Sequence, residues 1–65
     1  MLNRIILVES LLDDIKESFV KYEKAKKEIG KAMVGYGLSA ADSRESIKRR
    51  ITVCREELLK IEKEL

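Results

Sequence analysis

Residues 30–39, Gly30-Lys31-Ala32-Met33-Val34-Gly35-Tyr36-Gly37-Leu38-Ser39, decide how this chain folds, because they contain all of its glycines. The 65 residues include no proline, so glycine is the only strong helix breaker present. Residues that favour helices dominate on both sides of this segment. The sequence therefore predicts two helices, at about residues 3–33 and 39–64, joined by a turn at residues 34–38.

The second predicted helix has the more regular apolar pattern. Its apolar side chains recur at alternating steps of four and three residues: Ile47, Ile51, Cys54, Leu58, Ile61 and Leu65. This spacing is the a/d seam typical of coiled coils. The first helix repeats apolar residues at steps of three, four and seven, which also place them on one face: Val8, Leu11, Leu12, Ile15, Phe19, Tyr22, Ala25, Ile29, Ala32 and Met33.

The short turn predicts that the two helices run antiparallel. The expected fold class is therefore all-α, a two-helix antiparallel α-hairpin with a coiled-coil-like seam. Ser39 is expected to cap the second helix, and Asp42 to reach back and complete a capping box. The same seam is also compatible with a four-helix bundle built from two chains, because such patterns under-specify topology.

The composition limits how stable one copy of this hairpin can be. A chain this short seldom gains more than roughly 3–5 kcal/mol from its own core unless a disulfide or a metal holds it together. Cys54 is the only cysteine and there is no histidine, so neither is expected. We therefore expect an oligomer. The sequence lacks a run of about 18 apolar residues, so we expect no contact with a membrane and a cytoplasmic location.

An excess of apolar residues near the N-terminus predicts a contact with another protein or a second copy. At about 1.5 Å per residue the first helix is about 46 Å long and the second about 38 Å, so the first should overhang the second by about four to six residues. A frayed, partly exposed terminus is the alternative. The overhang contains the candidate contact residues Leu2, Ile5, Ile6, Leu7 and Val8.

Charge is unevenly distributed along the chain. Residues 24–50 carry eight basic and three acidic side chains, a net charge of +5, whereas the rest of the chain carries −3. A hairpin would gather the basic residues at its turn end, where they could contact nucleic acid or an acidic protein surface. A solvated surface is the simpler interpretation, and head-to-tail assembly is a third. The candidate anion contacts are Lys27, Lys31, Lys48, Arg49 and Arg50.

The sequence offers little for catalysis. It has no histidine to act as a general base and no glycine-rich phosphate loop. Cys54 is the one candidate nucleophile, and its place on the predicted seam indicates that it is buried and unreactive. We expect a non-enzyme with no catalytic residues, cofactor, metal or small-molecule substrate.

The segment Tyr36-Gly37-Leu38-Ser39-Ala40-Ala41-Asp42, followed by Ile47 and Ile51, resembles the helix junction of small head-to-tail joining proteins of tailed phages. That resemblance implies a virion protein that forms a ring at the capsid vertex, connects portal to tail and helps to retain packaged DNA. The expected function is therefore an assembly subunit, plausibly of a head–tail connector. The alternatives are a small helical inhibitor of a host protein and, less favoured, a nucleic-acid-binding hairpin.

Overall fold

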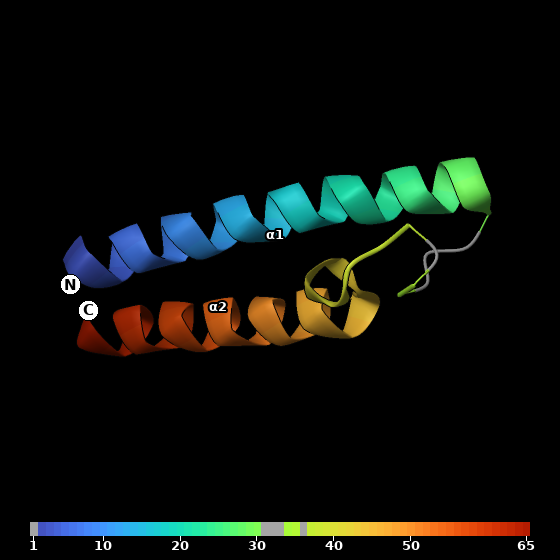
Figure 1. The fold of residues 1–65 in the computed structure, drawn as a ribbon. Coiled ribbons are helices and arrows are strands. Elements are labelled where there is room, and N and C mark those ends of the chain that lie inside the picture. Colours follow the sequence, from blue (N-terminus) through green and yellow to red (C-terminus); the bar gives the residue numbers. More distant parts are fainter. Residues whose placement is uncertain (1, 31–33, 36) are drawn as a thin grey trace.

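Two α-helices run antiparallel along the length of the molecule (Figure 1). The computed structural model describes residues 2–30, 34, 35 and 37–65. Helix α1 spans Leu2–Ile29, α2 spans Arg44–Glu64, and a short 3-10 helix, η1, spans Ala40–Asp42. Within the described residues there is no β-strand, only an isolated bridge between Val34 and Leu38. The prediction of an all-helical hairpin with two long helices is therefore confirmed.

Helix α1 ends earlier than residue 33, the end that the sequence predicted. Gly30 follows Ile29 with a φ of +76°, a left-handed conformation that glycine adopts without the penalty of a side chain. This conformation stops the α-helix at Ile29. Residues 31–33, the rest of the predicted helix, lie outside the described part of the chain.

Helix α2 begins later than predicted, at Arg44 rather than at Ser39. The Ser39 hydroxyl caps no backbone N–H and instead donates to the Asp42 carboxylate at 2.8 Å. Ser43 is the true N-cap, because its hydroxyl accepts the backbone N–H of Ser46 at 3.3 Å. The Ser43 hydroxyl also donates to the carbonyl of Ala40 at 2.8 Å, which joins η1 to α2. The predicted capping box was therefore wrong.

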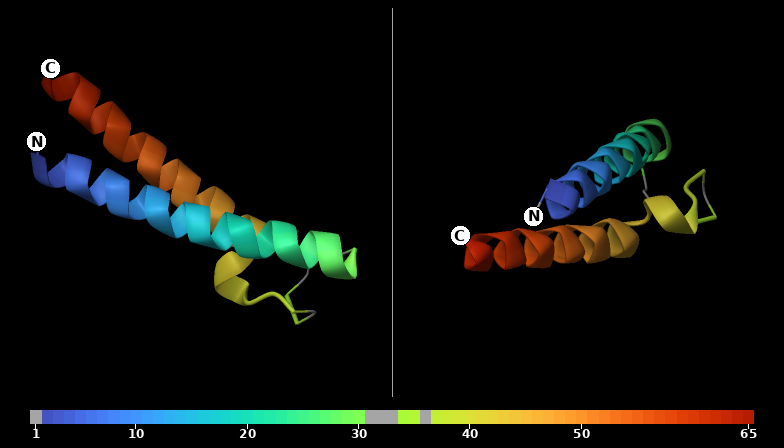
Figure 2. Two further views of the ribbon diagram at one scale, coloured as in Figure 1. Left: turned by 90° about the horizontal axis from the view of Figure 1, so that it is seen from above. Right: turned by 90° about the vertical axis from the view of Figure 1, so that its left-hand side faces the viewer.

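The connection between the helices folds back along the last turns of α1 (Figure 2). Leu38 from this connection is buried, as is Ala25 on α1, and both line the same hollow beside Asp42. The backbone N–H of Gly35 bonds to the carbonyl of Leu38 at 3.2 Å and closes the turn. The connection thus covers the part of α1 that extends beyond α2.

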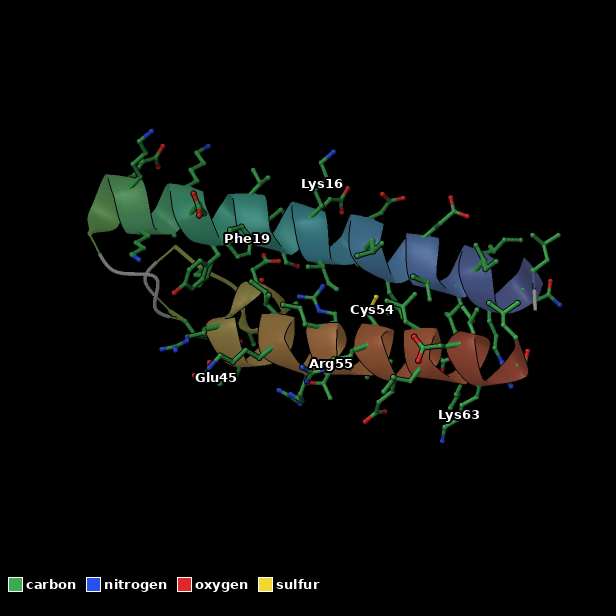
Figure 3. The ribbon with its side chains drawn as sticks, turned by 180° about the vertical axis from the view of Figure 1, so that it is seen from behind. Lys16, Phe19, Glu45, Cys54, Arg55 and Lys63 are labelled. Atoms are coloured by element: carbon green, nitrogen blue, oxygen red, sulfur yellow. The ribbon has the colours of Figure 1, made fainter. Side chains whose placement is uncertain are left out.

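The seam between α1 and α2 follows alternating steps of four and three residues on both helices. Its members are the buried or half-buried residues Arg4, Val8, Leu11, Ile15, Ser18, Tyr22 and Ala25 on α1, and Ser43, Ile47, Arg50, Cys54, Glu57 and Ile61 on α2. Cys54 is buried, as predicted, and its sulfur points toward α1 (Figure 3). The side chain of Ile29, also predicted for the seam, lies outside the described part.

Half of the predicted α2 seam was wrong. Ile51, Leu58 and Leu65 are 44%, 51% and 91% exposed, and Arg50 and Glu57, each one position earlier, face the seam instead. Each helix is therefore rotated about its own axis relative to the prediction. On α1, Leu12 and Phe19 are exposed, and Leu11 and Ser18, each one position earlier, face the seam.

Polar contacts hold the helices in this rotation. The Arg50 guanidinium donates to the Ser18 hydroxyl at 2.8 Å, to the carbonyl of Asp14 at 3.3 Å and to the carbonyl of Ala41. One side chain therefore ties α1, η1 and α2 together. At the other end, Arg4 forms an ion pair with Glu64.

Candidate interaction surfaces

The described residues leave more large apolar side chains exposed than they bury. Only five apolar residues of the described part are buried, namely Val8, Ala25, Leu38, Ile47 and Cys54, and no large side chain there is fully enclosed. Thirteen large apolar residues are exposed. Scattered exposed apolar residues are normal, but a contiguous group of them marks a contact surface.

Six of the exposed residues form one surface, which we call the apolar face. It consists of two rows at seven-residue spacing: Ile5, Leu12 and Phe19 on α1, and Ile51 and Leu58 on α2 with Leu65, the C-cap of α2. Each residue of these rows except Leu65 comes one position after a residue of the seam, such as Leu12 after Leu11. Phe19 lies on the side of the hairpin that faces the viewer in Figure 3.

Helix geometry explains why both rows share a face. One residue along a right-handed helix turns the side chain by about 100°. Because α1 and α2 point in opposite directions, a step of one residue from the seam turns both side chains toward the same side of the hairpin. A shallow groove of about 290 Å³ confirms this at one end, since Phe19, Tyr22, Ile47 and Ile51 all line it.

Charged side chains border the apolar face along both helices. They are Glu9 and Lys16 on α1, and Arg55 and Glu62 on α2, and all four are exposed. Lys16 and Arg55 are labelled at the outer edges of the helices in Figure 3. None of the four forms an ion pair within the described residues.

The opposite side of the hairpin is mainly polar. Its exposed or half-buried residues form two rows at seven-residue spacing: Leu7, Asp14, Lys21 and Glu28 on α1, and Ser46, Val53 and Lys60 on α2. Only two of these seven are apolar. The hairpin is therefore asymmetric, with one apolar face and one mainly polar face.

The predicted N-terminal overhang was wrong. The N-terminus of α1 lies beside the C-terminus of α2 (Figure 1), and the Arg4–Glu64 ion pair places the two ends level. The reason is that α1 ends early and its surplus length lies at the turn end. Of the candidate contact residues in this region, Val8 is buried in the seam at 6% exposure, whereas Leu2, Ile5, Ile6 and Leu7 are exposed.

The candidate anion-binding residues do not converge on one site. Lys27, Lys48 and Arg49 are exposed on two different helices, and Lys31 lies outside the described part of the chain. Arg50 is half-buried, and its guanidinium is occupied by internal hydrogen bonds. Arg50 therefore belongs to the framework of the fold rather than to a free basic surface.

Among the described residues, Asp42 is the one titratable group with a clearly shifted pKa. The hydroxyls of Ser39 and Ser18 lower the pKa of this carboxyl below its ordinary value of 3.8 by hydrogen bonding to the charged form. The positive charges of Lys21 and Arg50 act in the same direction, and desolvation opposes them. Asp42 is a structural carboxylate that joins the connection to α1.

The described residues contain neither a cluster of metal ligands nor a helix that could span a membrane. No group of three or more Cys, Asp or Glu side chains there is arranged to hold a metal ion. Neither of the helices described is long and apolar enough to cross a membrane.

Comparison of the chain with protein-family models, with curated proteins and with solved structures finds no match. The surfaces themselves are therefore the basis for any functional proposal.

Proposed function

We propose that this protein is a non-enzymatic assembly subunit that works through protein–protein contacts. The observation that carries the proposal is the imbalance, among the residues that the structure describes, between five buried apolar residues and thirteen exposed large ones. A soluble monomer with no partner would gain nothing from keeping an apolar face in water, whereas an assembly subunit buries such a face when it binds.

The finer proposal is a subunit of a phage head–tail connector. The support is the resemblance of residues 36–42 to the helix junction of small head-to-tail joining proteins. In that role the hairpin would be one of several copies at the capsid vertex. The exposed N-terminal residues Leu2, Ile6 and Leu7, which lie outside the apolar face, would be a second contact surface.

A photo-crosslinking experiment tests this function. A photoreactive amino acid replaces Ile6 in the protein produced during phage infection, and mass spectrometry identifies what it captures. Capture of a portal or tail-completion protein is the expected result. A probe at Lys24, exposed on the charged part of α1, is the matched control and should capture neither.

The same experiment addresses the alternative function. A helical inhibitor would use the same apolar residues, so specific capture of a single host enzyme would favour inhibition over assembly. Equal labelling from Ile6 and Lys24 would contradict both proposals.

A further inference from the structure

We propose that the apolar face binds a second copy of this chain about a two-fold axis perpendicular to the helices. In this dimer α1 packs antiparallel on α1 of the second copy, and α2 on α2. The inference rests on the proposed function, since it treats the chain as an assembly subunit, and it adds the surface, the partner and the geometry.

The register of the hairpin makes the apolar face symmetric. The contacts Arg4–Glu64 and Arg50–Ser18 fix which residues of α1 and α2 lie at the same level. The level halfway between these contacts is that of Leu11 and Glu57, and the residue that follows each of them, Leu12 or Leu58, is the middle residue of its row. A two-fold axis at this level places Leu12 and Leu58 each against its own counterpart.

The outer residues of the rows then pair with one another. Ile5 meets Phe19 of the second copy, and Ile51 meets Leu65 of the second copy. Every residue of the apolar face thus has an apolar partner, and four helices enclose a common core of the kind that two α-hairpins form when they pack as a bundle.

The charges beside the apolar face select this arrangement. On α1, Glu9 comes three residues before Leu12 and Lys16 four residues after it, so reversal about Leu12 brings each to within one residue of the other. On α2, Arg55 and Glu62 flank Leu58 in the same way. The dimer therefore gains two Glu9–Lys16 pairs and two Arg55–Glu62 pairs between the copies.

The competing arrangement brings like charges together. An axis parallel to the helices would pack α1 on α2 of the second copy at the same level. Glu9 would then face Glu62, and Lys16 would face Arg55, which repels at all four positions. It would also place both basic turn ends side by side, whereas the perpendicular axis puts them at opposite ends of the dimer.

Cysteine crosslinking distinguishes the two arrangements. Leu12→Cys and Leu58→Cys are made separately in the full chain, oxidised mildly alone and as a mixture, and the disulfides are mapped by mass spectrometry. The native Cys54 is buried and stays in place. We expect disulfides between two copies of residue 12 and between two copies of residue 58. Asp14→Cys, exposed on the opposite side, is the control and should give none.

Two results would overturn the proposal. One is a predominant disulfide between residues 12 and 58 in the mixture, which would indicate the parallel axis. The other is a yield for Leu12→Cys no higher than for Asp14→Cys, which would mean that the apolar face does not bind a second apolar face.

Charge exchange provides a test that leaves the hairpin core untouched. Glu9→Lys alone should weaken dimerisation by roughly three- to thirtyfold, because each exchange acts twice in a symmetric dimer. Lys16→Glu alone should do the same, and the double variant should recover the original affinity. No change in either single variant, or no recovery in the double variant, would contradict the pairing.

Failure of this inference is distinguishable from failure of the proposed function. A chain that does not self-associate but is still captured at Ile6 by a portal protein would refute the dimer alone. A dimer that captures no other protein would refute the connector role alone.

Discussion

Arg50 illustrates how a single side chain sets the rotation of both helices. It lies one position before the apolar Ile51, and its guanidinium contacts Ser18, Asp14 and Ala41. Arg50→Met keeps the apolar stem but removes these hydrogen bonds, so we expect the free energy of unfolding to fall by about 1–3 kcal/mol. Urea unfolding at a fixed protein concentration measures the change.

The matched control for this variant is Arg49→Met, whose side chain is exposed. It should change the free energy of unfolding by less than about 0.5 kcal/mol. Equal effects of the two variants would show that the Arg50 hydrogen bonds do not hold the hairpin together.

Asp42 makes the stability depend on pH. Its pKa is lowered in the folded state, chiefly by the Ser39 hydroxyl and next by Ser18, so its charged form stabilises the fold at a pH above the ordinary value of 3.8. This contribution is lost as the pH falls below 3.8 through the lowered pKa.

Asp42→Asn should therefore be less stable than the unmodified chain at pH 7, and the difference should shrink as the pH falls to about 2. Thermal unfolding followed by circular dichroism between these pH values measures it. Asp13→Asn, at an exposed position of α1, serves as the control for general charge effects. A difference that stays constant with pH would contradict the role of the Asp42 charge.

At the scale of the elements, Ser43 decides where α2 begins. Its hydroxyl accepts the Ser46 N–H and donates to the Ala40 carbonyl. Ser43→Ala removes both bonds, and we expect a loss of about 1–2 kcal/mol in the free energy of unfolding. Ser10→Ala, exposed within α1, should be close to neutral. If Ser10→Ala and Ser43→Ala unfold at the same urea concentration, Ser43 is not the cap.

The two helices and the glycine-rich connection were predictable, because helix-forming residues and the three glycines divide the chain clearly. The start of α2 was not, because Ser39 and Ser43 both suit a helix N-cap and only the fold shows which one is used. Ser43 lies next to Arg44, where the regular helix starts, whereas Ser39 is engaged by Asp42.

At the scale of the whole molecule, the division between seam and surface could not be predicted from apolar spacing. Ile47 and Cys54 fit two stripes, one continuing through Ile51 and Leu58 and the other through Arg50 and Glu57. The apolar spacing favoured the stripe through Ile51 and Leu58. The hydrogen bonds of Arg50 instead orient α2 so that the stripe through Arg50 and Glu57 faces α1. The apolar stripe is thereby left on the surface.

A signal for the apolar face was nevertheless present in the sequence. Ile5, Leu12 and Phe19 recur every seven residues, as do Ile51, Leu58 and Leu65. Such a second row beside a seam is typical of helices that contact two neighbours instead of one. A single hairpin supplies only one neighbour for each helix.

The molar mass of the chain in solution tests most directly whether the apolar face binds a second copy. Light scattering over a range of concentrations measures it. We predict twice the chain mass of 7.5 kDa, with Leu58→Gln shifting the equilibrium toward monomer. Val53→Gln, at a similarly exposed apolar position on the opposite side, should leave the dimer intact. At a chain concentration of roughly 1 mM, even an association free energy of about 4 kcal/mol gives a substantial population of dimer. A mass of 7.5 kDa for the unmodified chain at that concentration would contradict the proposed dimer.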